Sequence, residues 1–194
     1  MNVCVFCSSS SAVEPVYFHA ARDLGQLLGQ KKYSLIYGGA NVGLMDHLAT
    51  TVLKYGGRVT GIIPRKIQEK QLASIHLNEL VITETMEERK ALMRDRSDAF
   101  ITLPGGFGTL EETLEVITLK QLDYHQKPVV LVNTNAYFTD LLAQFEKSYR
   151  ETFARENYRK LYAIVSSPSE ALVYIENYIH EDLGTKWFHV PGVS

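Results

Sequence analysis

The stretch DAFITLPGGFGTLEETLEV, residues 98–116, contains the parts of a strand–loop–helix unit in order. Residues 98–106 are predicted to form a short apolar strand that ends in a glycine-rich loop, and residues 107–126 a long helix. Glycines let backbone N–H groups approach a ligand closely, and the start of a helix offers N–H groups without partners. The stretch therefore predicts an anion-binding loop inside an α/β fold.

The rest of the chain alternates in the same way between short apolar runs and helical patterns. Strands are expected at 3–7, 33–39, 58–64, 77–85, 127–133 and 161–167, and helices at 13–32, 43–57, 86–97, 137–150 and 168–180. The polar segment 65–76 has no clear period and is expected to be a mobile loop. Short apolar strands separated by helices predict a doubly wound, Rossmann-like α/β fold with a mostly parallel sheet and helices on both faces.

Length and charge set the broad class. The 194 residues are predicted to form one Rossmann-like nucleotide-binding domain, residues 1–180, followed by a tail, residues 181–194. The net charge of −2 gives no basic field that would attract nucleic acid or an anionic membrane. The N-terminal residues MNVCVFCSSS do not resemble a signal peptide, and no apolar run is long enough to cross a membrane. We therefore expect a cytoplasmic protein with no nucleic-acid or membrane partner.

Two cysteines, Cys4 and Cys7, form a C-x-x-C pattern. A redox pair normally lies at the start of a helix, whereas these residues fall on a predicted strand, where positions three apart face opposite sides. We therefore expect buried structural cysteines. The six histidines show no metal-binding spacing, and no metal site is predicted.

Small residues follow three of the predicted strands: Ser8–Ser11, Gly38–Ala40 with Gly43, and Pro104–Gly106 with Gly108 and Thr109. In open α/β sheets, ligands bind beyond the carboxyl ends of the strands. Any single loop of this kind also serves as a tight turn, but the three together favour a ligand that contains phosphate.

Known phosphate motifs fit this sequence poorly. Gly38 and Gly43 have the spacing of a P-loop, but Leu44 and Met45 stand where Lys and Ser or Thr are required. In GGFGTLE, Glu111 replaces the last glycine of the dinucleotide fingerprint, so NAD binding is weakly supported.

Glu111 and Glu112 follow the glycine loop, although a carboxylate repels an anion. Successive helical residues point about 100° apart, so both cannot face the loop. Glu112 shares a face with Gly108 and Thr109, whereas Glu111 is expected to be solvated in the first turn, and a solvated role is also the alternative for Glu112. A carboxylate beside a phosphate becomes favourable when the ligand develops positive charge. A ribose 5-phosphate unit does so when its glycosidic bond breaks.

Arg89 lies three residues after Met86 and four before Met93, on an apolar helix face. Such an arginine either extends its charged end to the surface or serves as a fixed guanidinium that holds a phosphate, a ribose hydroxyl or a catalytic carboxylate. Lys90 is expected at the periphery of the same site.

The segments YGGANVGLM (37–45), MEERKALM (86–93) and PGGFGTLEE (104–112) together resemble the LONELY GUY (LOG) family, cytokinin-activating nucleoside 5′-monophosphate phosphoribohydrolases. The resemblance covers roughly residues 2–176. It implies a Rossmann-like homodimer that cleaves an N-glycosidic bond without a cofactor, giving a free base and ribose 5-phosphate. It also implies that Arg89 and Glu112 are catalytic. The expected substrate- and phosphate-binding residues are Ser9, Gly39, Gly43, Met86, Lys90, Gly105, Gly106, Gly108 and Thr109.

Three positions depart from the family pattern: Ser8 and Ala40 replace glycines by small residues, and Asp46 places a charge where glycine is frequent. The identity of the base is therefore left open. Two other functions remain as alternatives, a non-catalytic nucleotide or cofactor carrier and a nucleotide-dependent oxidoreductase. The label "lysine decarboxylase", which many such proteins carry, finds no supporting Schiff-base lysine or pyridoxal-phosphate site in this sequence.

Overall fold

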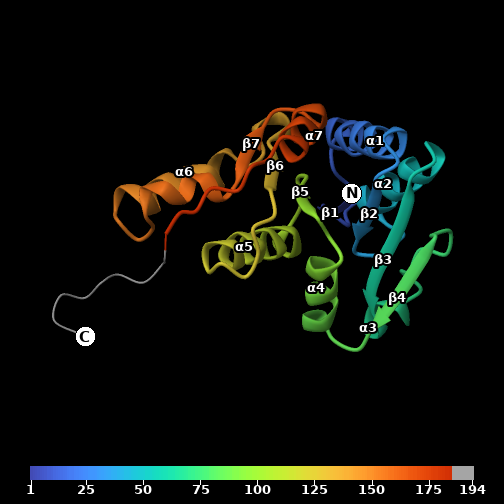
Figure 1. The fold of residues 1–194 in the computed structure, drawn as a ribbon. Coiled ribbons are helices and arrows are strands. Elements are labelled where there is room, and N and C mark those ends of the chain that lie inside the picture. The colour runs from blue at the N-terminus through green and yellow to red at the C-terminus, as the bar shows by residue number, and fades with distance from the viewer. Residues whose placement is uncertain (185–194) are drawn as a thin grey trace.

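A single parallel sheet organises the computed structural model, which describes residues 1–184 (Figure 1). Within these residues, seven strands pair in the order β4-β3-β2-β1-β5-β6-β7, and every pairing between them is parallel. The strands are β1 (Asn2–Phe6), β2 (Ser34–Tyr37), β3 (Arg58–Pro64), β4 (Glu79–Thr83), β5 (Ala99–Thr102), β6 (Val129–Val132) and β7 (Ala163–Val165). The doubly wound α/β prediction is confirmed.

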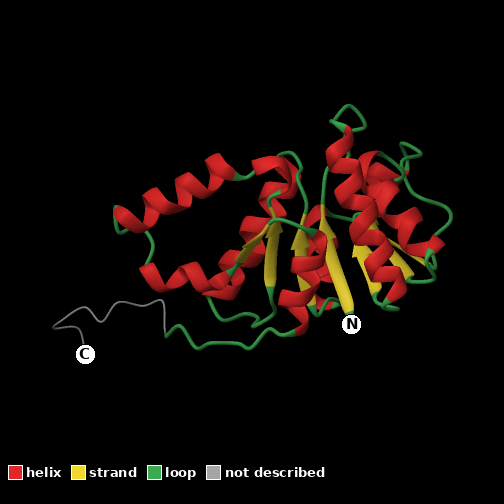
Figure 2. Cartoon of the chain, turned by 90° about the horizontal axis from the view of Figure 1, so that it is seen from above, coloured by secondary structure: helices red, strands yellow, loops and turns green. Residues whose placement is uncertain are grey.

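Helices connect the strands and lie on both faces of the sheet (Figure 2). They are α1 (Pro15–Gln30), α2 (Gly43–Lys54), α3 (Arg65–Gln68), α4 (Met86–Asp95), α5 (Phe107–Gln121), α6 (Thr139–Arg150) and α7 (Pro168–Glu176), with short 3₁₀ helices η1 (Thr134–Ala136) and η2 (Glu156–Leu161). Most predicted helices are a few residues too long at their C-terminal ends, because apolar spacing marks a face more clearly than an end.

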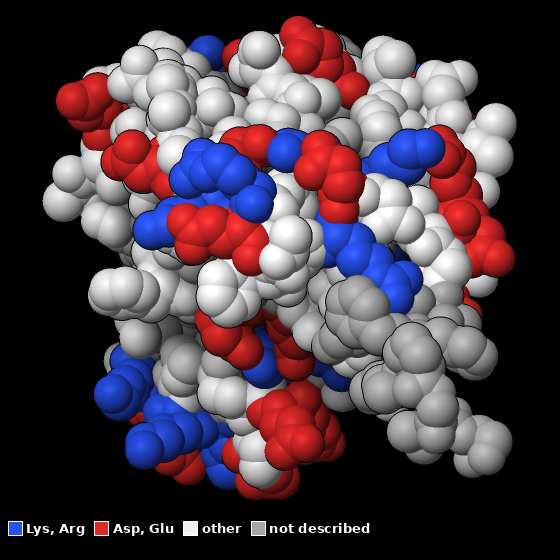
Figure 3. Space-filling model, turned by 90° about the vertical axis from the view of Figure 1, so that its left-hand side faces the viewer, with Lys and Arg blue, Asp and Glu red and all other residues white. Residues whose placement is uncertain are grey.

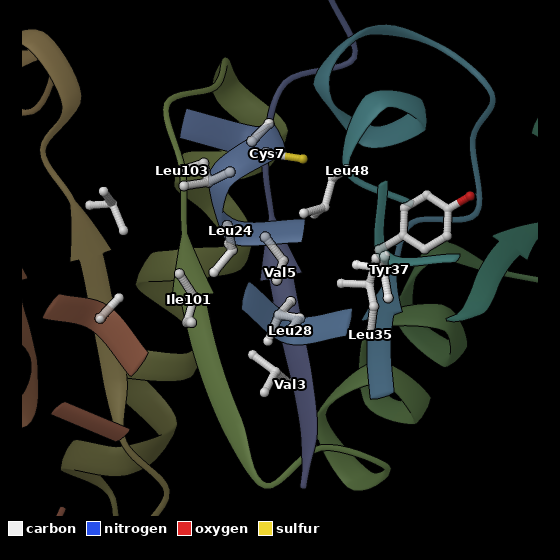
Figure 4. Packing of buried hydrophobic residues seen from close by; sticks show 14 of the residues in the cluster. Val3, Val5, Cys7, Leu24, Leu28, Leu35, Tyr37, Leu48, Ile101 and Leu103 are labelled. Carbon is white, nitrogen blue, oxygen red and sulfur yellow. The ribbon is translucent and has the colours of Figure 1, made fainter. Parts of the chain in front are cut away.

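Two apolar layers cover the sheet. On one face, Val3 and Val5 of β1 pack with Leu24 and Leu28 of α1, and α2 and α7 add to the same cluster (Figure 4). On the other face, Cys4 and other strand residues pack against Met93 of α4 and Val116 of α5. Helices α4 and α5 therefore lie side by side on one face, which brings the Arg89 and Glu112 segments together.

The two cysteines are buried, and each is a free thiol. Cys4 belongs to the cluster under α4 and α5, whereas Cys7 belongs to the cluster under α1 and α2. Burial is the main cause that raises the pKa of both thiols. The expectation of structural cysteines on opposite sides of a strand is confirmed.

The polar segment 65–76 has definite contacts that its composition did not predict. After the short helix α3, Ala73 forms an antiparallel bridge with Ala40. The Ser74 backbone N–H donates to the Gly39 carbonyl oxygen at 2.9 Å, and the Asn41 N–H donates to that of Leu72 at 2.8 Å. The segment is therefore attached to the loop after β2.

The strand order reverses between β1 and β5, so the connections after these two neighbouring strands leave in opposite directions along the sheet. Ligands in doubly wound folds bind at such a point. The Ser8 N–H donates to the Pro104 carbonyl oxygen at 3.3 Å, which joins the two loops there. None of the helices within residues 1–184 is long and apolar enough to span a membrane.

Candidate active site

The loop after β1 meets the start of α2. Gly43 has a φ of 59°, a conformation that favours glycine. A Cβ on this residue would lie 2.4 Å from the carbonyl carbon of Ser9, so a side chain is excluded. The Leu44 N–H donates to the Ser8 carbonyl oxygen at 3.0 Å. The predicted residues Ser9 and Gly43 are therefore in contact.

The loop after β5 is held from two directions. A Cβ on Gly105 would lie 2.1 Å from Oγ1 of the buried Thr109, so this glycine allows the close turn. The Tyr137 hydroxyl donates to the Gly105 carbonyl oxygen at 2.7 Å. Tyr137 follows η1, after β6, and this contact was not predictable from local sequence patterns because the two residues are 32 positions apart.

Gly106 and Gly108 differ from these glycines. Both are exposed, and a Cβ on either would meet no atom within 4 Å among the described residues. Neither has a positive φ. Packing and backbone conformation therefore do not require glycine at these two positions, and the space beside them is open to a ligand.

The helix starts at this edge of the sheet fall into two groups. Helix α4 is capped by Thr85, whose side chain accepts from the Glu88 N–H at 3.0 Å, and α7 is capped in the same way by Ser167. At the starts of α2 and α5, as at those of α1, α3 and α6, no N-cap side chain from the described residues caps the first turn. Apart from the Leu44 N–H, which donates to the Ser8 carbonyl oxygen, the first-turn N–H groups of α2 and α5 and the positive dipole ends of these two helices are available to an anion.

Arg89 and Glu112 form a buried ion pair behind the glycine loops. Arg89 Nη1 lies 2.6 Å from Glu112 Oε1, and Arg89 Nε donates to the Ile62 carbonyl oxygen at 3.0 Å. A Cβ on Gly38 would lie 2.5 Å from Arg89 Nη2, so the absence of a side chain there makes room for the guanidinium. Strands β2 and β3 and helix α5 together fix the orientation of this arginine.

Burial is the largest influence on Glu112 and raises the pKa of its carboxyl group, although the positive charge of Arg89 opposes this effect. The acid is therefore held close to a cation while it is largely shielded from water. A carboxylate in this environment interacts more strongly with nearby positive charge than it would in bulk water.

The next residues along the two helices, Lys90 on α4 and Glu111 on α5, also form an ion pair. Lys90 forms an ion pair with Glu111 and another with Glu115 at 3.3 Å, and Arg94 contacts Glu115 at 3.0 Å. Consecutive basic residues on α4 thus meet consecutive acids on α5. Glu111 is exposed, as expected, and it also takes part in the ion pairs that join the two helices.

The remaining predicted residues lie near these elements. Met86 is about half exposed at the first turn of α4, and Gly39, with a φ of 74°, packs against β3. The structure brings together Arg89 and Glu112, Ser9 and Gly43, and Gly105 and Thr109. Among the interactions of the described residues, none connects Met86 directly with the two glycine loops.

Comparison with known proteins places this geometry in a family. The family described as "Possible lysine decarboxylase" matches residues 45–175. The probable cytokinin riboside 5′-monophosphate phosphoribohydrolase LOGL1 of Oryza sativa subsp. japonica is 43% identical over 192 residues, 96% of this chain and 85% of that protein. The chain belongs to the LONELY GUY (LOG) family. LOG5 of Arabidopsis thaliana, a cytokinin riboside 5′-monophosphate phosphoribohydrolase, is 42% identical over 91% of this chain and 78% of its own length.

Solved structures share the LOG fold. The molybdenum cofactor binding protein of Rippkaea orientalis matches with a TM-score of 0.70 and 25% identity, over 90% of this chain and 94% of that one. The molybdenum cofactor carrier protein of Chlamydomonas reinhardtii matches with a TM-score of 0.67 and 16% identity, over 90% and 95% of the two chains. The Rossmann-like architecture is thus common to proteins whose names describe different functions.

Substitution of a closely packed glycine and of an open glycine should affect stability differently. Gly43→Ala should lower the free energy of unfolding by about 3 kcal/mol, or roughly 6–12 °C in Tm, because it combines a left-handed backbone with a clash at Ser9. Gly108→Ala should leave Tm unchanged or slightly higher, because alanine favours a helix and the space is open. Thermal unfolding followed by circular dichroism checks both. Equal losses would show that Gly108 also has a structural role.

Proposed function

We propose that this protein hydrolyses the N-glycosidic bond of purine or cytokinin nucleoside 5′-monophosphates, giving a free base and ribose 5-phosphate. One observation carries the proposal. The buried carboxylate of Glu112 is held by Arg89 of α4, and Glu112 itself lies on α5, the helix whose uncapped start borders the open glycine loop. The relatives named as phosphoribohydrolases share about two fifths of their residues with this chain, which supports the same reaction class.

In the proposed reaction, the N–H groups around Gly106, Gly108 and the start of α2 bind the 5′-phosphate, with Ser9, Gly39, Gly43, Gly105 and Thr109 shaping the loops. The bond between the base nitrogen and C1′ breaks, and its electron pair leaves with the base. Glu112 faces the positive charge that develops on the ribose ring, and Arg89 lowers the pKa of this carboxyl group against the effect of burial and orients it. Water supplies the hydroxyl group that ends on C1′, and the other proton of this water neutralises the base that has left with the electron pair.

A non-catalytic carrier is the second candidate, because two matching structures are named as molybdenum cofactor proteins. A carrier needs the anion-binding loops but gains nothing from a buried carboxylate beside them. Incubation with AMP and detection of free adenine distinguishes the two: release of adenine supports the hydrolase, and tight binding without release supports the carrier.

Glu112→Gln should keep the fold and lower turnover by roughly 100-fold or more, because the charge that meets the cationic transition state is removed. The measurement is kcat for base release from AMP, with circular dichroism to verify folding. Glu111→Gln is the matched control: it removes the adjacent acid, which contacts Lys90 instead, and should have a smaller effect. A folded Glu112→Gln enzyme with nearly normal turnover would contradict the assignment.

The phosphate loops predict a strong preference for AMP over adenosine. Charge-assisted hydrogen bonds contribute about 1.5–3 kcal/mol each, so losing two lowers kcat/KM by on the order of 100-fold or more. ATP should also be a poorer substrate than AMP if the loops close around a terminal phosphate. The test compares kcat/KM for the three compounds in one buffer, and equal values for adenosine and AMP would exclude a phosphate anchor.

We also propose that the protein is a cytoplasmic homodimer that pairs through the outer face of α5. Phe107 is 93% exposed and Leu114 40% exposed, and with Leu110 and Leu119 they line a shallow apolar groove of about 670 Å³. Exposed apolar patches of this kind are typical of protein interfaces.

Light scattering at micromolar concentration should give about 44 kDa, twice the 21.9 kDa of one chain. Leu114→Glu should shift the mass toward the monomer, because it places a charge in the groove while the exposed position tolerates it in the monomer. Lys147→Glu, on the exposed surface of α6, is the control that should keep the dimer. A wild-type mass near 22 kDa would refute the proposal.

A further inference from the structure

A cavity lies at the C-terminal end of α5, away from the glycine loops at the start of this helix. It has a volume of about 760 Å³, and its walls come from the end of α5, from η2 and from the segment 178–184 after α7. The segment is attached to η2 by the Asn157 side chain, which donates to the Leu183 carbonyl oxygen at 2.8 Å, and by an ion pair between Lys160 and Glu181. The cavity is within the size range of small-molecule sites.

Two buried polar groups line this cavity without a hydrogen-bond partner among the described residues. They are the amino group of Lys120, 6% exposed, and the hydroxyl group of Tyr158, 5% exposed. Buried polar groups are almost always paired, so two such groups from different elements in one cavity indicate a missing ligand atom.

Lys120 also lacks a counter-charge. Although Asp123, Glu181 and Asp182 line the cavity, none of them forms an ion pair with Lys120 within residues 1–184. Its amino group instead lies over the ring of Tyr178, with Nζ 4.5 Å from the ring centroid, which is a cation–π contact. Burial alone lowers the pKa of Lys120 to about 8. An uncompensated buried cation is costly, and a bound anion would offset that cost.

We propose that this cavity binds a small carboxylic acid with a flat apolar body, whose carboxylate accepts hydrogen bonds from Lys120 and Tyr158. Both protein groups are able to donate, which suits an acceptor. The tyrosine rings and the buried Leu161 suit an aromatic body, and Tyr178, half-buried after the end of α7, moves aside from Lys120 when the ligand enters.

The surrounding charge selects a singly charged ligand rather than a phosphate. Three carboxylates and two lysines, Lys120 and Lys160, line the cavity, so the lining carries no excess of positive charge and would repel a dianion more strongly than a monoanion. The side of the molecule on which α6 lies also carries basic and acidic residues interspersed, with no large field of one sign (Figure 3). This site therefore differs in ligand class from the glycine loops.

The test uses 2-naphthoate as the probe and its neutral amide, 2-naphthamide, as the matched ligand control, with binding measured by calorimetry. Wild-type protein should bind naphthoate at least tenfold more tightly than naphthamide. Lys120→Met should remove that preference by weakening only naphthoate binding, because the Lys120 amino group and the ligand carboxylate are then no longer in contact. Tyr158→Phe should weaken naphthoate binding severalfold.

Two control variants make the outcome specific. Lys147→Met removes an exposed lysine of α6 that pairs with Glu151 and does not line the cavity, and Gly108→Ala alters the glycine loop; both should bind naphthoate as the wild type does. Thermal unfolding verifies that Lys120→Met is folded. The proposal is overturned if naphthoate shows no saturable binding, or if folded Lys120→Met keeps the preference for naphthoate over naphthamide. Because no step requires hydrolysis of AMP, the result is independent of the proposed function.

Discussion

The buried contact between Arg89 and Glu112 is the interaction on which the rest of the site depends. Removing two charges from water is expensive, and their attraction repays this cost only when the geometry is good and the remaining hydrogen-bonding groups are satisfied. Here Arg89 also donates to the Ile62 carbonyl oxygen, and Gly38 leaves space for the guanidinium. The same contact joins α4 to α5, beside the ion pairs of Lys90. The fold therefore maintains a charged pair that a core built only for stability would replace with apolar residues.

Glycine has two separate uses around this pair. Gly38, Gly43 and Gly105 have close neighbours, so side chains there would displace Arg89, Ser9 or Thr109. Gly106 and Gly108 face open space. The first group builds the walls of the site, and the second leaves its entrance free, at a helix start that no side chain within residues 1–184 caps. A sequence motif cannot distinguish these two uses, because glycine serves both.

Local periodicity explains why much of this arrangement could be predicted from the sequence. The alternation of strands and helices gave the fold, and helical spacing separated Glu112 from Glu111 and placed Arg89 on an apolar face. The contacts that were missed join distant segments: Tyr137 with Gly105, the segment 65–76 with the loop after β2, and Lys120 with Tyr178. Each depends on how the sheet brings remote residues together. A lysine near the end of a helix ordinarily suggests solvent, so its burial was not visible in the pattern.

In the function we propose, the position of Glu112 separates a catalyst from a carrier on this shared fold. Uncapped helix starts and open glycines favour any phosphate-containing ligand, and a carrier would need only these. A carboxylate close to a phosphate weakens ground-state binding unless another charge compensates it. It becomes favourable when positive charge appears on the bound ribose, which happens only as the glycosidic bond breaks. Arg89 reduces the ground-state repulsion without removing the carboxylate. In the function we propose, the arrangement thus sacrifices some affinity for the substrate in order to bind its transition state more strongly, which is the condition for catalysis rather than storage.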